Sequence, residues 1–269
     1  MGKENSNVEM TFWDHLEELR WVFIRSLAAI AVISVVAFLN KNLIFNHVFL
    51  APKEPWFITN DLLCQLSTLL NTDNLCLNSD SLKIINIKLS GQFTTHLFIS
   101  FAVGLFLSSP YIFFEFWKFV KPALHSNEKK HSRGAVFVCS VLFIIGVLFA
   151  YFLVVPLTIN FLGSYQVSES VENTISLGSY IRNVVSVTLS IGFIFEIPVL
   201  VYFLTKTGII TPIFMQKSRR IIMVVLLILS AIITPPDIFS QIMVVIPLIL
   251  LYEISIKVSK RVYRNLETS

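Results

Sequence analysis

The fold of this chain is decided by the stretch RRIIMVVLLILSAIITPPDIFSQIMVVIPLILLYE, residues 219–253, in which two apolar runs flank a polar corner. Proline lacks a backbone N–H and keeps the preceding residue out of the helical region, so the two consecutive prolines end one helix and start another. Asp237 follows them, where its carboxylate caps free N–H groups of the second helix. Because about 20 apolar residues are needed to cross a bilayer, the stretch predicts a hairpin of two short spans, 221–233 and 238–256.

The composition extends this interpretation to the whole chain. Of the 269 residues, 55% are hydrophobic and 14% are charged, whereas a soluble domain carries about 25% charged residues. We therefore expect an all-α polytopic membrane protein with a single domain of six transmembrane helices. The expected spans are 21–39, 91–117, 134–156, 180–204, 221–233 and 238–256.

The basic residues predict the orientation of the chain. Sixteen of the 21 Lys and Arg lie in segments that six spans place on the side of the two termini, and the remaining five are spread over long loops of the other side. The positive-inside rule then puts both termini in the cytoplasm. Residues 1–20 end in TFWDHLEELR, whose apolar side chains recur at helical spacing, so we expect a helix on the membrane surface. Residues 257–269 form a basic tail.

The longest expected loop, 40–90, carries two of the three cysteines. Its prolines and polar middle favour irregular structure, with a short helix over 59–70. Cys64 and Cys76 pair if this loop lies outside the cell, and two unrelated thiols are the equally acceptable alternative. Neither these two residues nor Cys139 fit a CxxC or zinc pattern, so no metal site is expected.

Glu196 is the sharpest single feature, because it lies inside the apolar run VTLSIGFIFEIPVLVYFL. A carboxylate near mid-bilayer costs about 2.5–3.5 kcal/mol on insertion scales, so it is protonated, paired or in contact with a wet cavity. Pro198 is expected to kink this helix. We favour a functional polar site over a protonated glutamate that only holds neighbouring helices together, since intramembrane ionisable residues are usually functional.

Two further carboxylates, Glu18 and Glu128, are expected on the cytoplasmic side. Two fixed carboxylates there are able to receive guanidinium groups as bidentate pairs. From spacing alone, however, a surface helix acid and a loop acid paired with Lys129 or Lys130 is the preferred interpretation. Gln241 follows Asp237 by about one helical turn and extends the polar face of the last span.

Enzyme classes find no support in the motifs. The chain contains no HExxH, GxSxG, P-loop or GxGxxG, so we expect neither catalysis nor a cofactor. A proton-coupled small-solute transporter that uses Glu196 is the main alternative, but it predicts an inverted repeat, which we do not find. The divided basic residues give no indication of a nucleic-acid partner.

Six stretches of the chain carry motifs that belong together: HLEELR at 15–20, FVKPALHSNEKK at 119–130, FAYFLVVPLTINFLGSY at 149–165, FEIPVLVYFLTKTGIIT at 195–211, SRR at 218–220 and TPPDIFSQIMVVIPLILLYEISI at 234–256. Together these motifs resemble the TatC family, the core subunits of the twin-arginine (Sec-independent) protein translocase. They occur in the family's order and cover nearly the whole chain; the loop at 40–90 is longer than expected for the family.

The resemblance implies a signal-peptide receptor in the bacterial cytoplasmic membrane, because no presequence of an organellar form is visible. Such proteins bind twin-arginine precursor proteins, assemble with TatA- and TatB-type single-span proteins in larger complexes with several copies, contact membrane lipid and use the proton-motive force. Carried over residue by residue, the signal-binding residues are Glu18, Glu128, Phe119 and Pro122. The intramembrane polar residues that contact a partner's helix are Glu196, Asp237 and Gln241.

Overall fold

The structure is a computed structural model that describes residues 12–70, 83–120, 132–165, 168, 173–234 and 238–267. Nearly all of these residues are helical, so the expected all-α class is confirmed, with one small strand pair added. The elements in chain order are α1 (Phe12–Leu39), η1 (Leu43–Phe49), η2 (Ala51–Lys53), α2 (Ile58–Leu70), β1 (Lys83–Ile85), α3 (Gly91–Val120), α4 (Ser132–Phe149), η7 (Ala150–Val154), α5 (Val155–Ser164), β2 (Thr174–Ser176), α6 (Leu177–Ile194), α7 (Ile197–Lys206), α8 (Pro212–Lys217), α9 (Arg219–Ile233) and α10 (Ile238–Glu267).

Five helical segments of the described chain are long and apolar enough to cross a membrane. The expected hairpin corresponds to α9 and α10, but α9 has 15 residues, which is a length of about 22 Å at 1.5 Å per residue. This is shorter than the roughly 30 Å of a bilayer core, so a sixth crossing by α9 stays a prediction. The five segments are Leu16–Leu39, Gly91–Val120, Gly134–Gly163, Leu177–Lys206 and Gln241–Arg264.

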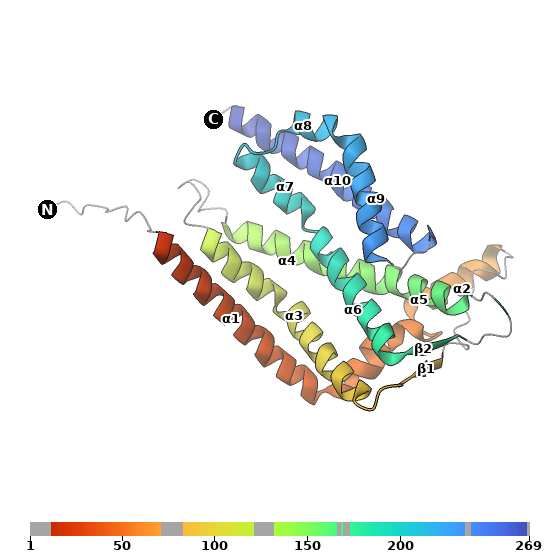
Figure 1. The fold of residues 1–269 in the computed structure, drawn as a ribbon. Helices are drawn as coiled ribbons and strands as arrows, with labels where there is room; N and C mark the ends of the chain where they lie inside the picture. Colours follow the sequence, from red (N-terminus) through yellow and green to blue (C-terminus); the bar gives the residue numbers. More distant parts are fainter. Residues whose placement is uncertain are drawn as a thin grey trace.

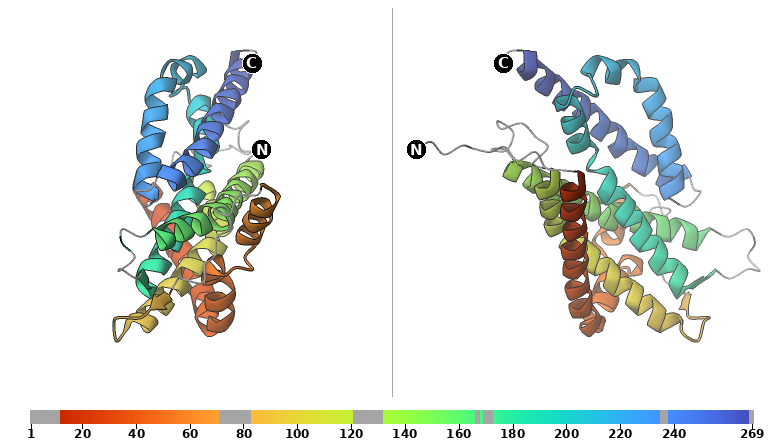
Figure 2. Two further views of the ribbon diagram at one scale, coloured as in Figure 1. Left: turned by 90° about the vertical axis from the view of Figure 1, so that its right-hand side faces the viewer. Right: turned by 60° about the vertical axis from the view of Figure 1, so that its left-hand side comes forward.

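The helices alternate in direction between two ends of the molecule. The first turn of α1, the last turn of α3, the first turn of α4 and the end of α10 lie toward one end, at the upper left of Figure 1. The end of α1, the starts of α3 and α6 and both strands lie toward the opposite end, as the side views also show (Figure 2). This arrangement has both described ends of the chain on the same side, as expected.

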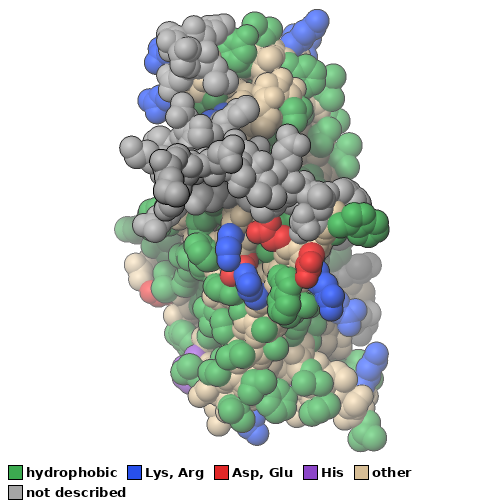
Figure 3. All heavy atoms as spheres, turned by 90° about the vertical axis from the view of Figure 1, so that its left-hand side faces the viewer, with side chains coloured by type: hydrophobic (Ala, Val, Ile, Leu, Met, Phe, Trp, Pro, Cys, Tyr) green, Lys and Arg blue, Asp and Glu red, His purple; other side chains and the backbone are tan. Residues whose placement is uncertain are grey.

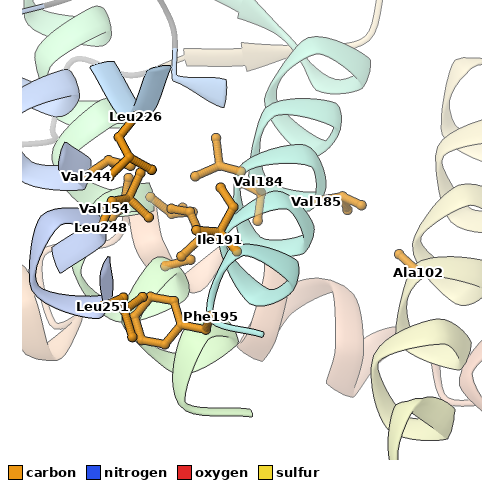
Figure 4. Close-up of a cluster of buried hydrophobic side chains, with 14 of the residues drawn as sticks. Ala102, Val154, Val184, Val185, Ile191, Phe195, Leu226, Val244, Leu248 and Leu251 are labelled. Carbon is orange, nitrogen blue, oxygen red and sulfur yellow. The ribbon is translucent and has the colours of Figure 1, made fainter. Parts of the chain in front are cut away.

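Helix α6 is the centre of the hydrophobic core because it packs on two sides. Ile191 of α6 lies in a cluster with Val154, Leu226 of α9 and Leu248 of α10, and all four are buried (Figure 4). On the other side of α6, Val185 points toward α3 (Figure 4). A helix that buries apolar side chains all round needs neighbours on every face, and α3, α4, α9 and α10 provide them.

Proline explains one predicted break and one error. The kink expected at Pro198 is confirmed: α6 ends at Ile194, and α7 starts at Ile197 with the proline in its first turn. The end expected at Pro156 is wrong, since the helix continues to Ser164. The π-helical turn η7 directly before this proline rearranges the backbone pattern there, so the chain tolerates a residue that has no N–H.

Three further boundaries differ from expectation. Residues 12–39 form one unbroken helix rather than a surface helix followed by a separate span, and α10 continues through the basic tail to Glu267. The loop expected over 157–179 contributes the rest of α5 and the strand β2, which pairs in parallel with β1. The short helix expected at 59–70 is confirmed as α2. Cys64 is disulfide-bonded and Cys139 is free, whereas Cys76 lies outside the described residues.

Candidate functional site

A cavity of about 340 Å³ lies between the first turns of α1 and the last turns of α3. The α1 residues that line it recur at intervals of three and four, which places them on one face of the helix. Figure 3 looks onto this side of the molecule and shows acidic and basic side chains gathered among hydrophobic ones. The cavity is lined by Glu18, Trp21, Val22, Arg25, Glu115 and Lys118.

One carboxylate of this cavity is paired inside the protein. Arg25 donates from Nη1 to Glu115 Oε2 at 3.3 Å, and the Tyr111 hydroxyl donates to Glu115 Oε1 at 3.0 Å. Glu115 is 4% exposed, whereas the side chain of Arg25 is 44% exposed. Both oxygens of the buried carboxylate therefore have a donor, as a buried charge requires.

The second carboxylate of the cavity, that of Glu18, has an oxygen atom without a hydrogen-bond donor in the described part of the chain. Its Oε2 atom is buried, yet no donor among the described residues bonds to it. A buried acceptor without a donor loses about 1–3 kcal/mol of solvation, and more when it is charged. Glu18 therefore offers a site for a donor that is supplied from outside the described part of the chain.

The remaining residues predicted to bind the signal peptide are only partly placed. Phe119 is half-buried in the last turn of α3, close in the chain to the cavity residue Lys118. Glu128 and Pro122 lie outside the described residues. The shared role of Glu18 and Glu128 in signal-peptide binding, which the family resemblance implies, thus stays a prediction.

Glu196 occupies the break between α6 and α7, where it is the N-cap residue of α7. Its Oε1 atom is buried and has no hydrogen-bond partner in the described chain. The polar side chain next to it is Cys139 of α4. The carboxylate therefore lies at the break between two apolar helices. The sequence had suggested a position within one helix that is kinked at Pro198.

Gln241 and Glu196 face different neighbours. The Gln241 amide donates to the carbonyl of Leu227 at 3.2 Å and so links α10 to α9, whereas Glu196 faces α4. Asp237 lies outside the described residues. The described contacts therefore do not join the predicted intramembrane polar residues into one cluster.

The ion pair between Arg25 and Glu115 was not predicted from the sequence. Glu115 is a lone acid near the end of an apolar run, where a carboxylate costs little, and Arg25 is a basic residue near the start of another. A signal was nevertheless present, because antiparallel neighbouring spans place the start of one and the end of the other at the same depth. Two opposite charges at that depth are expected to meet.

The sequence matches a known protein family. The model of the family described as Sec-independent protein translocase protein (TatC) matches residues 14–247. The chain is 41% identical over 258 residues to the Sec-independent protein translocase protein TatC of Blattabacterium, covering 95% of this chain and 97% of the relative. It is 30% identical over 261 residues to TatCy of Bacillus subtilis, covering 97% of this chain and 93% of that relative.

Two solved structures share the fold. Both are crystal structures described as the twin arginine translocase receptor TatC, the second of them in DDM. The first matches with a TM-score of 0.68 and 31% identity, covering 92% of this chain and 99% of the other. The second matches with a TM-score of 0.71 and 33% identity over 91% and 99% of the two chains.

Proposed function

The chain belongs to the TatC family of Sec-independent protein translocase proteins, and on this premise we propose that it is the receptor for twin-arginine signal peptides. Membership of this family gives the chain a role in twin-arginine translocation. It acts as a multi-pass membrane protein within the translocase complex. The family also favours this role over a proton-coupled solute transporter.

The observation that carries the proposal is the buried Oε2 atom of Glu18, which has no donor in the described chain. It lies in the cavity between the first turns of α1 and the last turns of α3. An arginine guanidinium presents a planar fork of donors that matches a carboxylate, whereas lysine brings a point charge. Glu18 is thus suited to discriminate arginine from lysine in a peptide that enters this cavity.

Glu128, Phe119 and Pro122 complete the proposed site. Glu128 supplies the second carboxylate for the second arginine, and Phe119 and Pro122 shape the loop that carries it. The support for these three residues is the family motif FVKPALHSNEKK, together with the position of Phe119 at the end of α3.

The test is binding of a fluorescent signal peptide to the purified protein in detergent. We expect the Arg-Arg peptide to bind the wild-type protein at least tenfold more tightly than the Lys-Lys peptide. Glu18→Gln and Glu128→Gln are each expected to weaken Arg-Arg binding by about tenfold, since a hydrogen bond to a charged group contributes about 1.5 kcal/mol or more. Glu17→Gln is the matched control, because Glu17 is the exposed neighbour of Glu18. Equal binding of both peptides would contradict the receptor function.

Partner binding is proposed at the apolar faces around Glu196, Asp237 and Gln241. Short spans pack against other helices or thin the bilayer, and α9 is such a helix. The proposed partners are TatA- and TatB-type single-span proteins, with several copies of this chain in a complex that uses the proton-motive force. The apolar helices and the bacterial relatives support a place in the bacterial cytoplasmic membrane.

Substitution of Glu196 tests this contact. We expect Glu196→Ala to reduce crosslinking to a single-span partner and transport together by about tenfold, because a partner's polar group loses a carboxylate in an apolar environment. Glu196→Gln keeps a hydrogen-bonding side chain and is expected to retain more crosslinking. Glu54→Gln, which lies outside the spans, is the control. Unchanged crosslinking and transport in Glu196→Ala would disprove this role.

A further inference from the structure

A second cavity, of about 840 Å³, lies at the end of the molecule opposite the Glu18 cavity. The parallel strands β1 and β2 explain it. Each strand is followed within a few residues by a long helix, β1 by α3 and β2 by α6, and the register places Ile85 beside Ser176. Parallel strands that lead into two helices bring both helix N-termini to one place, and the cavity lies between them.

The charge in this cavity has one sign. Lys88 and Arg182 line it, and none of its lining residues is an Asp or Glu. Neither cation forms an ion pair with a described residue. The first turns of α3, with 30 residues, and of α6, with 18 residues, add the positive ends of two helix dipoles. Together these groups favour an anion.

The cavity also holds donors that the protein does not use. Thr95 is 7% exposed and lines the cavity, yet its hydroxyl forms no hydrogen bond within the described chain. The hydroxyl is not among the fully buried polar atoms, so it is accessible from the cavity and able to donate to a molecule bound there. Gly178 lies in the first turn of α6, where a Cβ would meet no atom within 4 Å. The cavity therefore reaches the backbone of this turn.

The position of the cavity along the membrane normal indicates which kind of anion it binds. The two candidate spans begin at Gly91 and Leu177, so the cavity lies where the apolar part of the bilayer ends. Phe98, one of its lining residues, is 41% exposed and offers an apolar surface on the membrane side of the charges. An anion held above an apolar surface at this depth has the layout of a phospholipid, with its phosphate outward and its acyl chains inward.

We propose that this cavity binds the phosphate group of an anionic phospholipid, with Arg182 and Lys88 as the cations and Thr95 as a hydroxyl donor. The bound lipid would connect α3 with α6 through groups on both helices. This site is separate from the proposed signal-peptide site and does not depend on it.

The test uses dioctanoyl phosphatidylglycerol, dioctanoyl phosphatidylcholine and inorganic phosphate, each titrated into the detergent-purified protein and followed by native mass spectrometry. We expect saturable binding of phosphatidylglycerol at least tenfold tighter than that of phosphatidylcholine. Arg182→Gln is expected to weaken it about tenfold and Lys88→Gln about threefold. Lys83→Gln, an exposed lysine of β1 outside the cavity, is expected to change it less than twofold.

Two outcomes would overturn the proposal. Equal phosphatidylglycerol binding by wild type, Arg182→Gln and Lys83→Gln would mean that lipid binds elsewhere. Saturable binding of inorganic phosphate at the same affinity, lost in Arg182→Gln, would assign the cavity to a soluble anion. Gly178→Leu is the second variant, should Arg182→Gln not fold: it fills the open space without changing charge, and it is expected to lower lipid binding at least fivefold.

Discussion

Replacement of Gly104 by valine is expected to lower the free energy of unfolding by about 3 kcal/mol. Gly104 lies in α3 where it crosses α1, and a Cβ there would lie 2.8 Å from the carbonyl oxygen of Ile30 and in closer contact with the Ser34 hydroxyl. Because the carbonyl belongs to the backbone of α1, a side-chain rotation cannot relieve the clash. The two helices would have to separate, as at other small-residue contacts in membranes.

Gly134→Val is the matched control for this prediction. Gly134 lies near the start of α4, and a Cβ there would meet no atom within 4 Å. Both variants make the same change of residue in a helix, so their difference in unfolding temperature in detergent measures the α1–α3 contact. We also expect Gly104→Val to weaken peptide binding, because Glu18 and Glu115 lie on these two helices. Equal unfolding temperatures for the two variants would show that the helices separate easily.

The sequence predicted the membrane class and the position of most helices, but it did not predict how proline acts at each site. Pro198 and Pro156 look alike in sequence, as single prolines within apolar runs. The first coincides with a break beside Glu196, whereas the second follows a π-helical turn that keeps the helix continuous. Whether a proline breaks the helix or leaves it continuous depends on how the neighbouring helices pack, and a local sequence pattern contains no information about that packing.

The strands β1 and β2 were not predicted for a related reason. Each has three residues, which is too short for an alternating pattern to be recognised, and their partners lie about 90 residues apart in the chain. They nevertheless position the starts of α3 and α6. Pairing between short segments that are far apart in the chain depends on how the whole chain folds, so a local sequence pattern does not predict it.

The candidate site was predicted in part. Glu18 came from a family motif, and in the structure it lines the cavity with its Oε2 atom buried and without a donor among the described residues. Glu115 was not among the predicted site residues, because a carboxylate near the end of a span costs little. Its burial follows from Arg25 and Tyr111, and of these only Tyr111 is near it in sequence. A buried charge pair is thus hard to predict from either of its members alone.

This pair leads to a prediction about asymmetry. Arg25→Gln is expected to lower the free energy of unfolding by about 3 kcal/mol, because it leaves the carboxylate of Glu115, which is 4% exposed, without a cation. Glu115→Gln is expected to cost about 1 kcal/mol, because the cation that it leaves, Arg25, has a side chain that is 44% exposed and is able to turn to water. The residue that remains, and not the residue removed, decides the effect.

The double variant Arg25→Gln/Glu115→Gln completes the cycle. Two amides are able to share a hydrogen bond without a buried charge, so the double variant is expected to be more stable than Arg25→Gln alone, with a coupling energy of about 2 kcal/mol. The Arg219–Glu253 pair is the control: its distance is shorter, 2.8 Å, but its side chains are 45% and 37% exposed. Its coupling is expected to stay below about 1 kcal/mol. If the shorter, exposed pair coupled more strongly, distance rather than burial would set the energy, and the cavity between α1 and α3 would be less specialised for holding charge than its geometry indicates.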